Sequence, residues 1–307
     1  MAPISEAIRL YNRRSGHIEI EKVYGQKWMD IFYGRAWGRK IVASLLCRPL
    51  LSRTYGCLQQ HAVSRRTIAA FIDQYGIDMG EVAVPPGGFV SFNDFFIRRL
   101  KPDARPIDPR ASRLISPADS RLQVFGIEPD TRLTIKGAAM SLPQLLGVPR
   151  LDNTFLGGMC LVFRLAPPDY HRFGYVDEGI QGRVHTVPGP LHSVSPLALR
   201  HKPDIHGTNY RQWCFIQGVH LGTMIQVEVG AMMVGSIVQQ RPDGGPCRRG
   251  GEKGYFQFGG STVILVLQPG RAAMDSDILH YSAMGLETRV LYNEGVGTIN
   301  RIGDNIA

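Results

Sequence analysis

The segment YFQFGGSTVILVL, residues 255–267, joins two apolar, strand-like runs through Gly259, Gly260, Ser261 and Thr262. Glycine weakens a strand interior, and it usually marks a bulge, a bend or a close approach of the backbone. The segment therefore has two interpretations. One is a tight turn between two strands, and the other is a strained, accessible backbone at which a reaction takes place.

The pattern around this segment predicts an α+β protein. From about residue 110 onward the chain consists of short apolar runs rich in β-branched residues and separated by glycine and proline, which is typical of strands. Residues 27–75 instead mix large apolar and basic side chains in a helical pattern. We expect a helical N-terminal region, residues 1–109, packed on a mainly antiparallel β core, residues 110–307.

The charge predicts an anionic partner. The formal net charge is +9, and the two candidate partners are nucleic acid and an anionic membrane surface. We expect no nucleic-acid partner, because the sequence has neither a Cys/His finger spacing nor an RNP-like aromatic box. Residues 27–53 are basic and rich in aromatic side chains, which suits a membrane interface. The alternative is a helix that packs on its own domain and exposes a basic face.

The five cysteines indicate a reducing compartment. Their number is odd and no CxxC motif occurs, so we expect unpaired thiols and no metal site. The first residues lack the apolar core of a signal peptide, and no stretch offers 18 apolar residues. These features predict a cytoplasmic location.

Two polar motifs supply candidate site residues. SPADSRL, residues 116–122, places Asp119 in a turn-like context, where an aspartate usually caps or forms the turn. PPDYHRFGYVDEG, residues 167–179, places His171 just after an apolar run, where a histidine more often has a structural role. A fold can still assemble a serine, a histidine and an aspartate from separate strand ends into a relay, because such relays depend on geometry and not on sequence order.

Several motifs together resemble the phosphatidylserine decarboxylase family. They occur in the order expected of that family and cover nearly the whole chain: SFNDFFIRRLKPDARPID (91–108), SPADSRL, DYHRF (169–173), VGAMMVGSI (229–237) and EKGYFQFGGSTVILVLQPG (252–270). The opening YNRRSGHIEIEKVYG, residues 11–25, is similar to the shorter bacterial branch.

The resemblance implies a carboxy-lyase that is made as an inactive proenzyme. Self-cleavage is then expected between Gly260 and Ser261, giving a large and a small chain and converting Ser261 into a covalent pyruvoyl group. This cofactor acts as an electron sink when phosphatidylserine loses CO2 and becomes phosphatidylethanolamine. The remaining Gly-Ser pair, Gly235–Ser236, is expected to line the site and stay intact. The enzyme is expected at the cytoplasmic face of the cell membrane as a peripheral protein, with a homodimer as one candidate assembly.

The sequence departs from the family pattern at two places. Family members usually read YHRFH, and the second histidine serves with the aspartate and serine as the relay for self-cleavage, but here Gly174 stands at that place. A lesser departure is Ser120, where glycine often follows the aspartate. Three outcomes are open: His171 serves both steps, His185 or His192 replaces the missing base, or cleavage is very slow, which is the expectation. Two other functions compete, a relative acting on a free amino acid and an uncleaved, inactive lipid-binding homologue.

Overall fold

The computed structural model describes residues 7–21, 56, 58–128, 132–135, 138–201, 204–231, 236–259 and 261–300. The segment expected to dock on membranes, residues 27–53, and the expected cleavage residue Gly260 lie outside these described residues.

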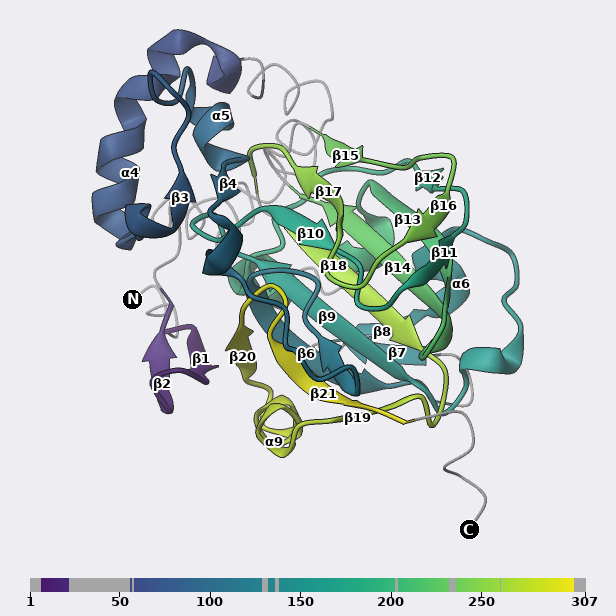
Figure 1. Ribbon diagram of the computed structural model, residues 1–307. Coiled ribbons are helices and arrows are strands. Elements are labelled where there is room, and N and C mark those ends of the chain that lie inside the picture. Colours follow the sequence, from purple (N-terminus) through teal and green to yellow (C-terminus); the bar gives the residue numbers. More distant parts are fainter. Residues whose placement is uncertain are drawn as a thin grey trace, which may run out of the picture.

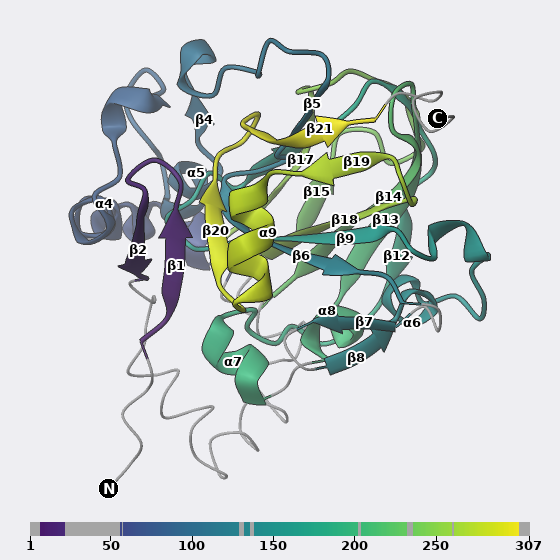
Figure 2. The same cartoon turned by 90° about the horizontal axis from the view of Figure 1, so that it is seen from below.

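Within the described residues, the largest sheet has eleven strands and forms the middle layer of the molecule (Figures 1 and 2). Its strands run in the order β16 (Gly245–Cys247), β11 (Gly179–Gln181), β13 (Arg211–Gly218), β14 (Gly222–Gly230), β18 (Ser261–Leu267), β9 (Met159–Leu165), β6 (Ser120–Gly126), β20 (Glu287–Val290), β1 (Arg9–Asn12) and β2 (His17–Ile20), and β12 (His185–Val187) pairs with β13. All these pairs are antiparallel except β1 with β20, which confirms the expected α+β class with a mainly antiparallel core.

Smaller sheets cover one face of this layer, and short helices cover the other (Figure 2). The covering sheets are β10 (Arg172–Gly174), β17 (Glu252–Phe256) and β15 (Ile237–Gln239) in one, and β19 (Ala272–Met274), β21 (Gly295–Ile299) and β5 (Arg113–Ile115) in the other. The opposite face carries α6 (Leu142–Leu146), α7 (Pro196–His201), α8 (Ile205–Thr208) and the strand pair β7 (Arg132–Ile135) and β8 (Ala138–Ser141), with η5 (Asn153–Phe155) in the loop before β9.

Strand β18 is buried from end to end because both faces of the sheet are covered. Successive side chains of a strand point to opposite faces. Val263 and Leu265 accordingly enter the core under the small sheets, and Ile264 and Val266 enter the core beside α6. This double burial explains why the sequence of β18 is a continuous apolar run and shows no alternation.

The N-terminal helices form a separate aromatic core beside the sheets (Figure 1). The elements are η2 (Ala62–Thr67), α4 (Ile68–Tyr75), η3 (Met79–Glu81), α5 (Phe92–Phe96) and η4 (Pro102–Ala104), with the short strands β3 (Val82–Ala83) and β4 (Arg99–Leu100); α9 (Ser276–Ala283) packs against β6 and β20. Phe258 belongs to this aromatic core, with its ring 5.0 Å from that of Phe92 and 5.1 Å from that of Phe96. The helical part therefore holds the segment that precedes Ser261.

The region 1–109, for which helices were expected, also contains the strand pairs β1–β2 and β3–β4, which the sequence pattern did not predict. The division of the chain at residue 109 stays a prediction.

Candidate active site

Ser261 is the first residue of β18 and lies where the chain crosses from the small sheet to the large one. Strand β17 pairs with β10 and β15, whereas Ser261 lies opposite Leu165 of β9 and Gly230 of β14 in the main sheet. Gly259 has a φ of 141°, a conformation that residues with a side chain rarely adopt. The segment thus connects two strands and also holds an unusual backbone, so both interpretations of the sequence describe part of it. The expected accessibility was wrong, because Gly259 and Ser261 are buried under the elements that cover both faces of the main sheet.

His171 contacts the Ser261 side chain. The Oγ atom of Ser261 lies 3.3 Å from Nδ1 of His171, and Nε2 of His171 lies 3.1 Å from the carbonyl oxygen of Ala166. A carbonyl oxygen only accepts hydrogen bonds, so Nε2 carries the proton and Nδ1 presents its lone pair to the serine hydroxyl. The Phe96 ring stacks on the imidazole at 3.9 Å between centroids and fixes the plane of the ring.

The surroundings of His171 keep its imidazole neutral. Both His171 and Ser261 are fully buried. Burial, with a further contribution from the positive charge of Arg98, lowers the pKa of His171 to about 3. A neutral imidazole is the form that can accept a proton, so at neutral pH His171 is ready to act as a base toward Ser261.

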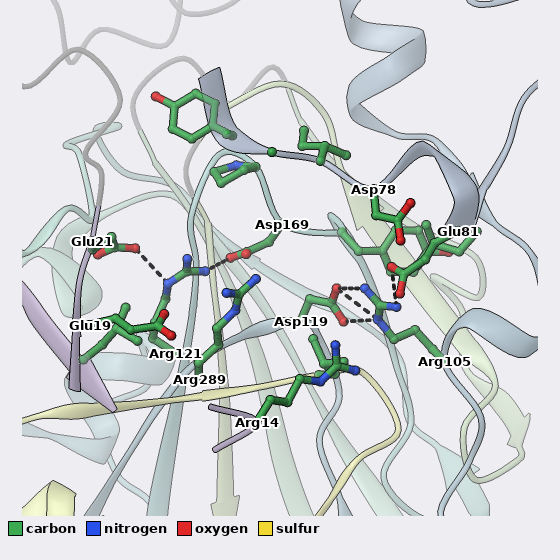
Figure 3. A pocket seen from close by; sticks show the side chains of 18 of the residues that line it. Arg14, Glu19, Glu21, Asp78, Glu81, Arg105, Asp119, Arg121, Asp169 and Arg289 are labelled. Carbon is green, nitrogen blue, oxygen red and sulfur yellow. Dashed lines mark hydrogen bonds and ion pairs between the residues drawn. The ribbon is translucent and has the colours of Figure 1, made fainter. Parts of the chain in front are cut away.

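Asp119 is hydrogen-bonded to other residues (Figure 3). Its carboxylate accepts hydrogen bonds from Nε of Arg105 at 2.8 Å, from Nη2 of Arg105 at 2.7 Å and from the backbone N–H of Tyr292 at 2.8 Å. Arg105 also pairs with Glu81 at 2.8 Å. Among the described residues, the structure therefore brings His171 to Ser261 and gives Asp119 a different set of partners.

The carboxylate that supports the imidazole is Asp169, which the sequence did not single out. Its side chain accepts a hydrogen bond from the backbone N–H of Ala166 at 2.6 Å and so closes the turn whose carbonyl holds His171. The signal in the sequence was a proline-rich turn ending in aspartate, PPD at 167–169, since aspartate often bonds to nearby backbone in turns.

Position 174 has no room for a side chain. A Cβ atom on Gly174 would lie 2.1 Å from Oη of Tyr292 and 2.5 Å from the carbonyl oxygen of Gly251. Tyr292 thus occupies the space beside the position where a second histidine was expected, and its hydroxyl donates to the Gly250 carbonyl at 2.9 Å.

The other imidazoles named as substitutes have different surroundings. His185 stacks on Trp213 with ring centroids 4.4 Å apart, and the backbone of His192 bonds to the Asn209 side chain. Within the described part of the chain, His171 is the imidazole that is hydrogen-bonded to Ser261.

Ser236, the serine of the second Gly-Ser pair, lies beside the crossing segment. Ser236 donates its hydroxyl to Oε1 of Gln257 at 2.7 Å, and its carbonyl accepts from the backbone N–H of Gln257 at 3.0 Å. Gln257 is four residues before Ser261, so Ser236 contacts the segment that leads to the site.

Comparisons with known proteins identify the family of the chain. The family model described as phosphatidylserine decarboxylase matches residues 92–297. Proteins named phosphatidylserine decarboxylase proenzyme are similar over almost the full length. That of Clostridium botulinum (strain Alaska E43 / Type E3) is 39% identical over 95% of this chain and 99% of the relative. That of Desulfitobacterium hafniense (strain Y51) is 38% identical over 94% and 98%, and that of Clostridium kluyveri is 39% identical over 94% and 98%. The chain belongs to the phosphatidylserine decarboxylase family.

Proposed function

We propose that this chain is a self-cleaving proenzyme that becomes a pyruvoyl-dependent decarboxylase of phosphatidylserine, with Ser261 and His171 as its central residues. The observation that carries the proposal is the 3.3 Å contact between Oγ of Ser261 and the unprotonated Nδ1 of His171. Ser261 directly follows the Gly259–Gly260 pair in the sequence. The activity itself follows from membership in the family, whose matched relatives carry the name of the decarboxylase proenzyme.

Self-cleavage begins at Ser261. A serine hydroxyl is a weak nucleophile until a neighbouring base takes its proton, and Nδ1 of His171 is in position to do so. The hydroxyl oxygen attacks the carbonyl carbon of Gly260, the peptide bond breaks, and an ester forms while the amine of Ser261 takes up a proton. A base then removes the Cα proton of residue 261, a double bond forms between Cα and Cβ, and the bond between Oγ and Cβ breaks, leaving a carboxylate on Gly260. Hydrolysis of the resulting dehydroalanine releases ammonia and leaves the pyruvoyl group.

Residue 261 is a suitable place for this cofactor. Its surroundings are fully buried and offer a neutral imidazole within hydrogen-bond distance. The pyruvoyl group supplies a carbonyl that accepts the electron pair left when CO2 departs. His171 remains beside it, held by Ala166 and Phe96, and we assign it a proton-transfer role in both steps.

Asp119 has a positioning role in this proposal. By accepting from the backbone of Tyr292 and from Arg105, it fixes the Tyr292 ring in the space beside Gly174. Two competing functions have no particular observation in their favour, the decarboxylation of a free amino acid and lipid binding by an uncleaved homologue.

The substrate is a membrane lipid, so we also propose that the enzyme docks on the cytoplasmic face of an anionic membrane through residues 27–53. The basic and aromatic composition of that segment supports this assignment. Among the described residues, no helix is both long and apolar enough to cross a bilayer. A homodimer stays a prediction that the mass in solution would test.

The test of the proposed function is a cleavage assay by intact mass. The unmodified chain should separate into fragments of residues 1–260 and 261–307, the second blocked by pyruvoyl, and should release CO2 from phosphatidylserine. Ser261→Ala and His171→Ala should each leave a single uncut chain. The matched control is Ser236→Ala, which removes the hydroxyl of the other Gly-Ser pair and should still be cut. Normal cutting of Ser261→Ala would refute the proposal.

A further inference from the structure

A cavity of about 470 Å³ lies beside the proposed active site (Figure 3). Asp169 and Tyr170, the two residues directly before His171, form part of its wall. The cavity is located at the end of the main sheet where β6 and β18 begin and β9 ends. There, Arg121 of β6 pairs with Arg164 of β9, and the next residue of β9, Leu165, pairs with Ser261. The wall residue Tyr170 directly precedes His171, whose imidazole contacts Ser261.

Most charges in the cavity wall neutralise one another. One cluster joins Arg105 to Asp119 and Glu81, and another joins Arg121 to Glu21 and Asp169 (Figure 3). Two further acids are engaged locally: Glu19 accepts from Asn12 and Ser15, and Asp78 accepts from the backbone N–H of Gly80.

Three arginines of the wall form no ion pair within 4 Å among the described residues: Arg14, Arg98 and Arg289. Arg98 is the buried member, with 5% of its surface exposed. Its Nη2 atom donates to the carbonyl oxygens of Pro168 and Asp169, at 2.9 and 3.2 Å. Its Nε and Nη1 atoms have no hydrogen-bond partner in the described part of the chain. Unpaired donors on a buried charged group are costly, and burial lowers the pKa of Arg98 accordingly.

Arg289 stands in a row of like charges across the sheet. It lies opposite Arg121, which in turn lies opposite Arg164, in two antiparallel strand pairs. Like charges directly opposite one another destabilise a sheet. Arg121 and Arg164 are compensated by Glu21 and by further carboxylates, whereas Arg289 has no such partner among the described residues and lines the open cavity.

We propose that Arg98, Arg289 and Arg14 bind the phosphodiester of the lipid headgroup and so anchor the substrate beside residue 261. This proposal rests on the proposed function, which supplies the lipid. Arginine is well suited to phosphate because its planar fork can donate two parallel hydrogen bonds. The carboxylate of the substrate is the less suitable ligand, because it leaves as neutral CO2. Cations bound to it would stabilise the starting state more than the transition state.

Binding to the uncut Ser261→Ala protein tests the proposal without using activity. The probes are dihexanoyl phosphatidylserine, dihexanoyl phosphatidylethanolamine, which keeps the phosphodiester and lacks the carboxylate, and inorganic phosphate, each measured by calorimetry. Arg289→Gln and Arg14→Gln together should weaken both lipids about tenfold or more, because each removes charge-assisted hydrogen bonds to phosphate. Both side chains are exposed, so these variants should fold. Arg98→Gln should weaken lipid binding further. If this variant does not fold, the protein with Arg289→Gln and Arg14→Gln still tests the proposal.

The matched control is Arg99→Gln, because Arg99 is the exposed neighbour of Arg98 and does not line the cavity. It should change affinity less than twofold. A loss of affinity confined to phosphatidylserine would mean that the arginines bind the carboxylate. Unchanged affinity for both lipids would mean that they bind neither the carboxylate nor the phosphodiester. Binding of inorganic phosphate alone would assign the site to a free anion. Each of these results overturns the proposal. CO2 release by the unmodified protein, measured separately, shows whether the proposed function has failed instead.

Discussion

At the scale of single residues, the site depends on how His171 is held. Its Nε2 proton is committed to the Ala166 carbonyl, and its ring lies against Phe96, so Nδ1 has one orientation and faces Ser261. A protonated imidazole could not accept the serine proton. Burial therefore keeps His171 in the neutral form that can accept a proton, although the same burial lowers the affinity of the imidazole for that proton.

The low pKa of His171 has a consequence for stability. In the unfolded chain the imidazole titrates near its ordinary pKa of about 6.5, whereas in the folded protein the pKa is about 3. Protonation below pH 6.5 therefore favours the unfolded state, at about 1.4 kcal/mol per pH unit. The free energy of unfolding of Ser261→Ala should fall by about 2 kcal/mol more, between pH 6.5 and pH 5, than that of Ser261→Ala with His171→Gln. Urea denaturation at both pH values measures this difference, and parallel pH profiles would contradict it.

Gly174 gives a second prediction at this scale. An added methyl group would meet Tyr292 and the Gly251 backbone, so Gly174→Ala should lower the free energy of unfolding by about 1–3 kcal/mol. Gly126→Ala is the matched control, because a Cβ there meets no atom within 4 Å, and its effect should stay within about 0.5 kcal/mol. Urea denaturation of both variants makes the comparison. An unchanged stability of Gly174→Ala would show that Tyr292 moves away easily and that the position could accept a histidine.

At the scale of elements, the site depends on the passage of the chain from β17 to β18. The two strands belong to different sheets, and a buried ion pair joins those sheets. Lys253 of β17 donates to Glu228 of β14 at 2.8 Å, and both side chains are fully buried. Burial alone lowers the pKa of Lys253, but Glu228 raises it above the ordinary value, so the lysine stays charged. The pair fixes the small sheet on the main sheet just before the cleavage segment.

Removing one member of this pair should be severe. Lys253→Met leaves the Glu228 carboxylate buried without its cation, and we expect a loss of about 3–5 kcal/mol in the free energy of unfolding. Arg110→Met provides the matched control. Arg110 forms an equally short ion pair with Asp108 at 2.7 Å, but its side chain is 66% exposed and solvent screens the pair, so the loss should be much smaller. Equal losses in the two variants, measured by urea denaturation, would show that burial does not set the strength of the Lys253 pair.

The elements also show which features a sequence can predict. The apolar run of β18 and the glycines before it predicted a strand with an unusual entry, because both signals are local. The pairing of β1 with β20 was not predictable in this way, because it joins residues 277 positions apart, such as Leu10 and Glu287, and neither short strand has a strong pattern. The same limit applied to the site. The motifs indicated Ser261, His171 and Asp119, but which carboxylate supports the imidazole depends on a turn, where Asp169 bonds to Ala166.

At the scale of the whole molecule, the net charge of +9 has to be reconciled with a lipid substrate. A basic surface is attracted to anionic lipid, and each cation near such a surface contributes about 1 kcal/mol. The proposed docking segment, residues 27–53, would concentrate this attraction in one part of the chain, in contrast to a general effect of charge. Salt weakens the attraction, because ions screen charges beyond about 10 Å at 0.1 M.

Neutralising Arg35, Arg39 and Lys40 together tests this docking. Sedimentation with vesicles of phosphatidylglycerol and phosphatidylcholine should show binding weakened by up to about 100-fold at low salt, since three cations near the surface are lost. High salt should reduce the difference between this variant and the unmodified protein.

The matched control neutralises three exposed arginines of the described residues, Arg110, Arg241 and Arg248, and so removes the same net charge elsewhere. An equal loss in both variants would mean that binding follows total charge. Unchanged binding of the Arg35, Arg39 and Lys40 variant would mean that the segment packs on its own domain. A loss confined to that variant, together with CO2 release that declines only when the lipid is presented in vesicles, would establish the segment as the membrane contact and leave the chemistry at residue 261 intact.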